Sequence, residues 1–275
     1  MARTRAQEQA QSSKQNSVQG QSIAKGKAPK KRLQPNDTAD EEHRAPPAKA
    51  TKKTEKNKVS DPKLKRILDG YGTFPLEDAG LAEPEKPTAE TMLAHLLHAQ
   101  LVAARISHQI AARTFHEIMK AGYANLSTLE KSSWEQRTEI LTKAGYTHYR
   151  EKTATELGGL AKFVRERYDG DLSNLYESAK SSEPNQFRSV VRKGLKEIKG
   201  VGEVALDVFC DTAQGLWREL APFLDARSLK TALQLGLTDD LGELYDAVGK
   251  DPVTMCRLSA ALATVRLKGL RDHFA

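Results

Sequence analysis

The chain has 275 residues, which is enough for one or two domains with a substantial hydrophobic core. Of its net charge of +7, residues 1–60 contribute +8, with 14 Lys and Arg against 6 Asp and Glu, and residues 61–275 contribute −1, with 29 against 30. No signal peptide and no apolar run of membrane length occur, so we expect a soluble, intracellular protein that does not bind membranes. The two cysteines, Cys210 and Cys256, exclude a disulfide scaffold, and we expect both to be buried thiols.

Residues 1–60 predict a disordered basic tail. They hold few large apolar side chains and are rich in Gln, Ser, Lys, Ala and Pro, so they cannot bury enough surface to offset the entropy of ordering. Basic clusters occur at Lys30, Lys31 and Arg32 and again over Lys49–Lys58. Such clusters indicate a nuclear-import signal or a nucleic-acid-binding arm, with a solvated linker as the alternative. We therefore expect a nuclear protein.

The rest of the chain carries the start and stop signals of short helices. Residues 61–86 predict a short helix followed by an irregular, ordered lead-in, and residues 87–275 predict a helical domain. The expected helices are a long one after Pro87, two with capping boxes at Ser127 and Ser133, one over 147–167, one over 187–198, one opened by Asp225 and one over 252–268 after Asp251. Because no window alternates with a period of two, the fold class is predicted to be all-α, with about ten helices.

The segment Gly200-Val201-Gly202 joins two apolar-periodic stretches and is typical of a helix–hairpin–helix. The glycines allow backbone conformations closed to other residues and let the main chain approach a ligand closely. The helix that follows would direct its unpaired N–H groups at a DNA phosphate, which positions the protein without reading base sequence. Val201 is expected to close the apolar junction over Ile198 and Ala205. The alternative is an ordinary connection between two helices.

Asp225 lies 23 residues after Gly202, directly after an apolar pair, and is predicted to open a helix that ends at Gly236. The commonest role of an aspartate at such a position is to cap the helix. A functional role is compatible with capping, because a cap fixes the side chain and the helix dipole favours its ionised form.

These segments together resemble the helix–hairpin–helix DNA glycosylase superfamily, in its endonuclease III-like branch. The resemblance also uses Met92–Ser107, "MLAHLLHAQLVAARIS", and Ile140–Leu157, "ILTKAGYTHYREKTATEL", and it covers roughly residues 88–270. It implies a two-lobed helical fold that binds duplex DNA. It also implies base excision, in which a damaged or mismatched base is flipped into a cleft and its N-glycosidic bond is hydrolysed.

The resemblance also implies roles for individual residues. Asp225 would be the catalytic carboxylate, which stabilises the oxocarbenium charge or activates the attacking nucleophile. The Gly200–Gly202 turn, with Lys199 beside it, would contact the DNA backbone. Gln100 falls where the family places a residue that fills the gap left by the flipped nucleotide; an ordinary exposed helix glutamine is the alternative.

Several positions depart from the family's pattern. Val204 stands where bifunctional members carry the lysine that forms a Schiff base, so we expect no lyase activity. The C-terminal four-cysteine cluster is missing, and we expect no iron–sulfur cluster, metal or other cofactor. Thr91–His116 contains no acidic residue, although adenine-specific members carry a glutamate there. Glu203 would place a negative charge beside the phosphate site and oppose binding.

The sequence thus predicts a monomeric, monofunctional DNA glycosylase of base-excision repair. The alternatives are a catalytically inactive helix–hairpin–helix module that binds DNA, and a helical scaffold without a nucleic-acid role. His95 and His98, about one helical turn apart, would face a flipped base, with a surface position or core packing as the alternative. Trp134, Trp217 and Tyr146 are expected in the core.

Overall fold

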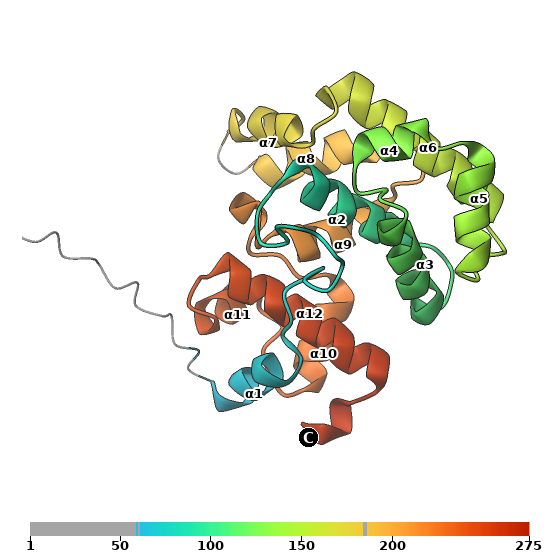
Figure 1. The fold of residues 1–275 in the computed structure, drawn as a ribbon. Helices are drawn as coiled ribbons and strands as arrows, with labels where there is room; N and C mark the ends of the chain where they lie inside the picture. Colours follow the sequence, from blue (N-terminus) through green and yellow to red (C-terminus); the bar gives the residue numbers. More distant parts are fainter. Residues whose placement is uncertain (1–58, 60, 184–185, 275) are drawn as a thin grey trace, which may run out of the picture. The chain divides into compact units, whose positions relative to one another are not determined.

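The structure is a computed structural model that describes residues 59, 61–183 and 186–274 (Figure 1). The chain divides into two units, Met1–Lys53 and Thr54–Ala275, and every described residue belongs to the second. The predicted disordered tail and its cluster of Lys30, Lys31 and Arg32 lie outside the described residues.

The all-α prediction is confirmed for the described residues, which form twelve α-helices, two 3-10 helices and no strand (Figure 1). The helices are α1 (Pro62–Tyr71), α2 (Ala89–Val102), α3 (His108–Lys120), α4 (Leu126–Lys131), α5 (Trp134–Lys143), α6 (Arg150–Tyr168), α7 (Ser173–Lys180), α8 (Phe187–Lys196), α9 (Glu203–Ala213), η1 (Arg218–Leu220), α10 (Ala226–Gln234), α11 (Leu241–Ala247), α12 (Pro252–Lys268) and η2 (Arg271–His273). None of these helices is long and apolar enough to span a bilayer.

Local capping signals set most helix boundaries. Ser133 and Gln136 form the predicted capping box of α5, and Asp251 caps α12. The helix expected to begin at 147 begins at Arg150, three residues later. The expected capping box at Ser127 is wrong, because Asn125 caps α4 through the N–H of Thr128. Asparagine is an equally good cap, so the earlier residue of the two takes the role.

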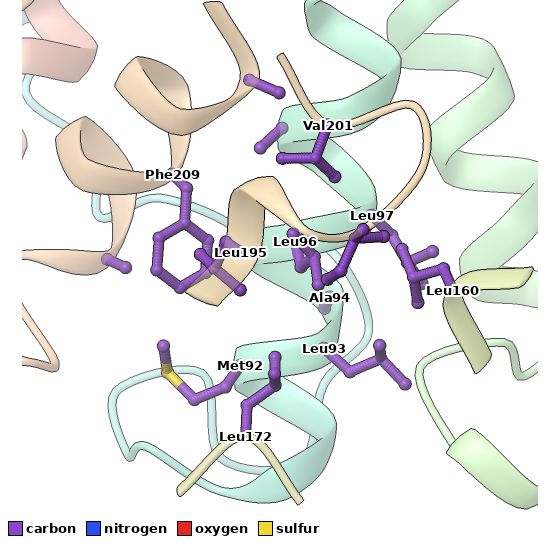
Figure 2. Close-up of a cluster of buried hydrophobic side chains, with 14 of the residues drawn as sticks. Met92, Leu93, Ala94, Leu96, Leu97, Leu160, Leu172, Leu195, Val201 and Phe209 are labelled. Carbon is purple, nitrogen blue, oxygen red and sulfur yellow. The ribbon is translucent and has the colours of Figure 1, made fainter. Parts of the chain in front are cut away.

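The larger core is built around α2, of which ten of 14 residues are buried. A helix that is apolar on nearly all sides must be covered on all sides, and α2 packs against α3 and α9. Figure 2 shows Leu96 and Leu97 of α2 between Leu195 of α8 and Leu160 of α6. Burying each such side chain contributes about 1.5–3 kcal/mol.

A second core joins α1, α10, α11 and α12. Met255, Leu258 and Leu262 of α12 lie at its centre. Because α12 also packs against α9, the two cores meet along the α9–α12 contact.

The burial predicted for the aromatic and cysteine side chains is confirmed in part. Trp217 and Tyr146 are buried, and Cys210 and Cys256 are buried free thiols, as predicted. The core assignment of Trp134 is wrong: it is 40% exposed at the start of α5, and its Nε1 donates to Thr155 Oγ1 of α6 at 3.1 Å.

His95 belongs to the core of the molecule, and His98 is half-buried at its edge. His95 is fully buried, with its Nδ1 3.0 Å from Thr212 Oγ1 of α9, and the His98 ring packs edge-to-face on Phe115. Burial, aided by the neighbouring His98, lowers the pKa of His95 to about 3, and burial lowers that of His98 to about 4. Both imidazoles are therefore neutral at pH 7.

We expect the free energy of unfolding to decrease as pH falls from about 7 toward 4, because the histidines take up protons with ordinary pKa values of about 6.5 only when unfolded. Each adds a slope of at most about 1.4 kcal/mol per pH unit in this window. In urea unfolding, His95→Gln or His98→Gln should flatten the slope, whereas His148→Gln at an exposed position should not. Unchanged slopes in both core variants would contradict the neutral buried state.

Candidate nucleic-acid interface and the Asp225 site

Residues 197–202 join α8 to α9 in a short turn. The N–H of Val201 donates to the carbonyl of Ile198 at 3.0 Å, and both side chains are buried, so the apolar junction forms as predicted. Gly200 has a φ of +92°, in the region that favours glycine. Gly200 and Gly202 are exposed, and no side chain caps the first N–H groups of α9. The turn thus presents bare main chain to solvent.

Gly200 is also required by its neighbours. A Cβ at this position would lie 2.7 Å from Gln100 Nε2 and 2.7 Å from Glu156 Cδ. Gln100 is 5% exposed, which excludes the alternative of an exposed helix glutamine. Its amide nitrogen and oxygen have no hydrogen-bond partner in the described ranges. The side chain lies under the turn and does not project from the surface as a wedge.

A pocket of about 350 Å³ opens beside the turn. Its polar lining includes Gln100, Arg105, Tyr149, Lys152, Glu156 and Gly200. Lys152 Nζ lies 3.6 Å from the largely buried carboxylate of Glu156. Arg105 and Lys199 are exposed and form no ion pair with another described residue. Two uncompensated cations therefore flank the exposed main chain of the turn.

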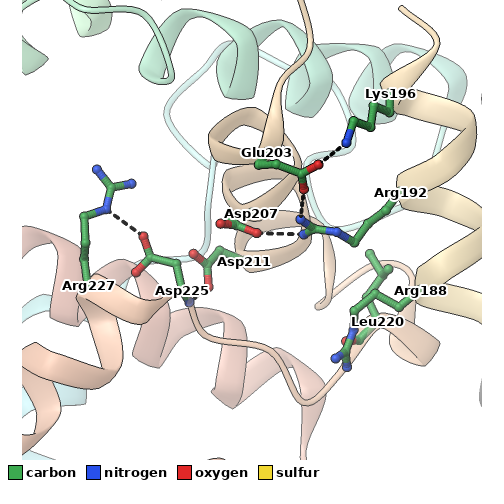
Figure 3. A network of polar contacts seen from close by, with 9 residues as sticks. All are labelled: Arg188, Arg192, Lys196, Glu203, Asp207, Asp211, Leu220, Asp225 and Arg227. Atoms are coloured by element: carbon green, nitrogen blue, oxygen red, sulfur yellow. Dashed lines mark hydrogen bonds and ion pairs between the residues drawn. The ribbon is translucent and has the colours of Figure 1, made fainter.

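An ion-pair network closes the other side of the hairpin (Figure 3). Arg192 of α8 donates to Glu203 Oε2 at 2.7 Å and to Asp207 Oδ1 at 2.7 Å, and Lys196 also binds Glu203. Hydrogen bonds from Lys196 and Arg192 lower the pKa of the Glu203 carboxyl group. Glu203 thus neutralises two cations of α8. The adjacent Val204 is 45% exposed and offers no amine.

A second contact of α8 holds the segment that leads to Asp225. The Arg188 guanidinium donates to the carbonyl oxygen of Leu220 at 2.7 and 3.1 Å and to that of Pro222 at 2.7 Å. Figure 3 shows Arg188 and Leu220 below the Arg192 network. The first helix of the hairpin and the segment that leads to α10 are therefore tied together by direct hydrogen bonds.

Asp225 caps α10, as predicted. Its Oδ1 accepts the N–H of Ser228 at 2.6 Å and its Oδ2 accepts from Arg227 Nε at 2.9 Å (Figure 3). Burial acts to raise the pKa of Asp225, but the hydrogen bonds from Ser228 and Arg227 outweigh it and lower the pKa. The side chain is 6% exposed, and Arg266 Nη1 lies 3.9 Å from Oδ1. Asp225 is thus an ionised, fixed carboxylate that does not face open solvent.

Three residues of this region were not singled out from the sequence. Glu156 is buried under Gly200, Arg266 lies beside Asp225, and Asp211 binds the Asp225 main chain. Each looks in the sequence like an ordinary polar position of a surface helix. Their roles depend on contacts between helices far apart in the chain, which local patterns do not encode. Among the described residues, no group of three or more His, Cys, Asp and Glu side chains is arranged to hold a metal ion.

Comparison of the chain with family models, with curated proteins and with solved structures gave no significant match in any of the three. The resemblance to helix–hairpin–helix glycosylases therefore rests on the motif residues.

The two glycines of the turn should respond differently to substitution. Gly200→Ala combines a positive φ with contacts at 2.7 Å, and we expect it to destabilise the protein by about 1–3 kcal/mol. Gly202→Ala is the matched control, because a Cβ there meets no atom within 4 Å. Urea unfolding of both variants measures the difference. Equal stabilities would contradict the close packing of Gly200 on Gln100 and Glu156.

Proposed function

We propose that the chain binds duplex DNA through the α8–α9 turn and removes a damaged or mismatched base by hydrolysing its N-glycosidic bond. The observation that carries the catalytic part is the state of Asp225, an ionised carboxylate held by Ser228 and Arg227 at the start of α10. Arg188 ties the segment before it to the hairpin. We also propose that the chain has the helix–hairpin–helix glycosylase fold.

The DNA-binding part is supported by the surface of the turn. Exposed Gly200 and Gly202 leave room for a phosphate to approach the main chain, and α9 adds uncapped N–H groups and the positive end of its dipole. Arg105 supplies positive charge in the pocket beside the turn, and the exposed Lys199 supplies it within the turn itself. Contacts of this kind recognise the backbone and position the duplex.

The chemistry assigned to Asp225 follows from its charge. As the bond between the base and C1′ of the sugar breaks, positive charge develops on the sugar, and a fixed carboxylate stabilises it. Water adds to C1′, and the base leaves with a proton. For Asp225 to act, Arg227 must swing aside, and the Arg227 side chain is 56% exposed and able to do so. Because Val204 provides no amine, the strand stays intact at the abasic site.

A second candidate is a module that binds DNA without cutting the glycosidic bond. It is favoured by the burial of Asp225, which is 6% exposed and lies close to both Arg227 and Arg266. In that case Asp225 is only a helix cap, and the hairpin is the functional element.

A panel of lesion-containing and mismatched duplexes tests the enzymatic proposal. We expect strand breaks at one substrate only after alkali treatment, since the enzyme leaves an abasic site. Asp225→Asn should lower the rate on the order of 100-fold, because the amide cannot supply the negative charge. Asparagine caps helices as well as aspartate, so the fold is kept.

Absence of product from every duplex, or an unchanged rate in Asp225→Asn, would refute the enzymatic proposal. Duplex binding without product would then select the second candidate.

Glu203→Gln tests the DNA-binding part. Loss of this carboxylate releases Lys196 and leaves Arg192 paired with Asp207 alone, so we expect tighter binding to duplex DNA and a salt dependence steeper by about one phosphate contact. Asp246→Asn on α11 is the control, because it frees Lys250 in the loop that follows this helix. Fluorescence anisotropy at several salt concentrations gives both quantities. A weaker affinity or an unchanged slope in Glu203→Gln would count against binding at the turn.

A further inference from the structure

Helix α9 carries a buried carboxyl group, Asp211, that none of the steps above uses. Asp211 is 6% exposed, and its Oδ1 accepts the backbone N–H of Asp225 at 3.2 Å. Ser259 of α12 contributes a further hydrogen bond to the same carboxyl group. Figure 3 shows Asp211 directly beside Asp225. Helices α9, α10 and α12 therefore meet at this one side chain.

The contact completes the cap of α10 from another helix. In a capping box, the third residue of a helix reaches back with a Glu or Gln side chain to the N–H of the capping residue. In α10 this third residue is Ser228, and Asp211 supplies the acceptor in its place. The carboxylate of Asp225 is held by Ser228 and its main chain by Asp211. Removing Asp211 would leave the Asp225 main chain without this acceptor, while the side chain would still be held by Ser228 and Arg227.

We propose that Asp211 is the positioning residue of Asp225 and fixes the start of α10 to the second helix of the hairpin. The effect of Asp211 on catalysis depends on the proposed function. Asp211 does not touch a substrate in this role; it acts through Asp225, and it links the turn assigned to DNA binding with the carboxylate assigned to chemistry.

The charges around the pair favour a proton on Asp211. The titratable and charged groups that act on it are Asp225 from the start of α10, Asp207 from α9, and Cys256 and Arg266 from α12. Burial first, and the charge of Asp225 second, raise the pKa of Asp211 well above its usual range. Asp225 keeps the negative charge because Arg227 and Ser228 bind it. Of the two buried carboxyl groups, Asp211 is therefore the one on which a proton is favoured.

This protonation state predicts an alkaline limit. As pH rises through the pKa of Asp211, its carboxyl group ionises. This second negative charge repels the carboxylate of Asp225 and disturbs its position. Asparagine at position 211 keeps an acceptor oxygen for the Asp225 N–H and cannot ionise, so it should restore positioning and abolish the limit. Alanine removes the acceptor and should displace Asp225.

The test measures single-turnover base release between pH 5 and 9.5, with the duplex from the panel that gives most product. We expect Asp211→Asn to stay within about 3-fold of the wild-type rate and to lose the alkaline decline. Asp211→Ala should be slower by about 10-fold or more, since small displacements of a reacting group are costly. Asp246→Asn on α11 is the control for removal of an aspartate. A wild-type rate and pH profile in Asp211→Ala would overturn the proposal, as would equal impairment of both Asp211 variants.

Unfolding measurements separate this inference from the proposed function. If the wild-type protein releases no base, the proposed function fails, and the positioning role is decided by unfolding of Asp211→Ala, Asp225→Ala, which removes the side-chain cap, and the double variant. We expect the unfolding equilibrium constant of the double variant to differ by about 5-fold or more from the product of the single effects. A smaller deviation overturns the positioning role.

Discussion

The packing of α9 between α2 and α12 is the contact on which both the fold and the candidate site depend. On one side, α9 covers the helix at the centre of the larger core, and the His95–Thr212 contact lies in that interface. On the other side, it meets α12 of the second core. The exposed turn begins α9, and Asp211 lies near its other end. A single rigid helix therefore carries the proposed DNA contact and supports the proposed catalytic carboxylate.

The charges of the site are arranged by pairing. Glu203 binds Arg192 and Lys196, so these two cations of α8 are neutralised, while Arg105 at the pocket and Lys199 in the turn form no ion pair with a described residue. Asp225 lies among two arginines and the buried carboxyl group of Asp211, whose pKa is raised by burial and by the charge of Asp225. This arrangement keeps one negative charge at the start of α10 and directs positive charge to the face with the exposed turn.

Much of the fold could be predicted from the sequence, because it depends on local rules. The caps at Asp225, Ser133 and Asp251 and the glycine turn are short-range signals, and the structure has them where the pattern predicts. Burial was harder to predict from the sequence, because Trp134 is exposed and Gln100 is buried. Both outcomes depend on which helix covers which face. The role of Asp211 depends on a contact across 14 residues between different helices, which periodicity does not show.

The central claim is that the main chain of the α8–α9 turn binds the phosphate backbone of duplex DNA. The most direct test is a titration of the ¹⁵N-labelled protein with a duplex, followed by NMR of backbone amides. The account predicts that the amides of Gly202, Glu203 and Val204 shift most, that the shifts weaken with salt, and that amides of α11 stay in place. Binding that leaves these three amides unchanged would contradict it.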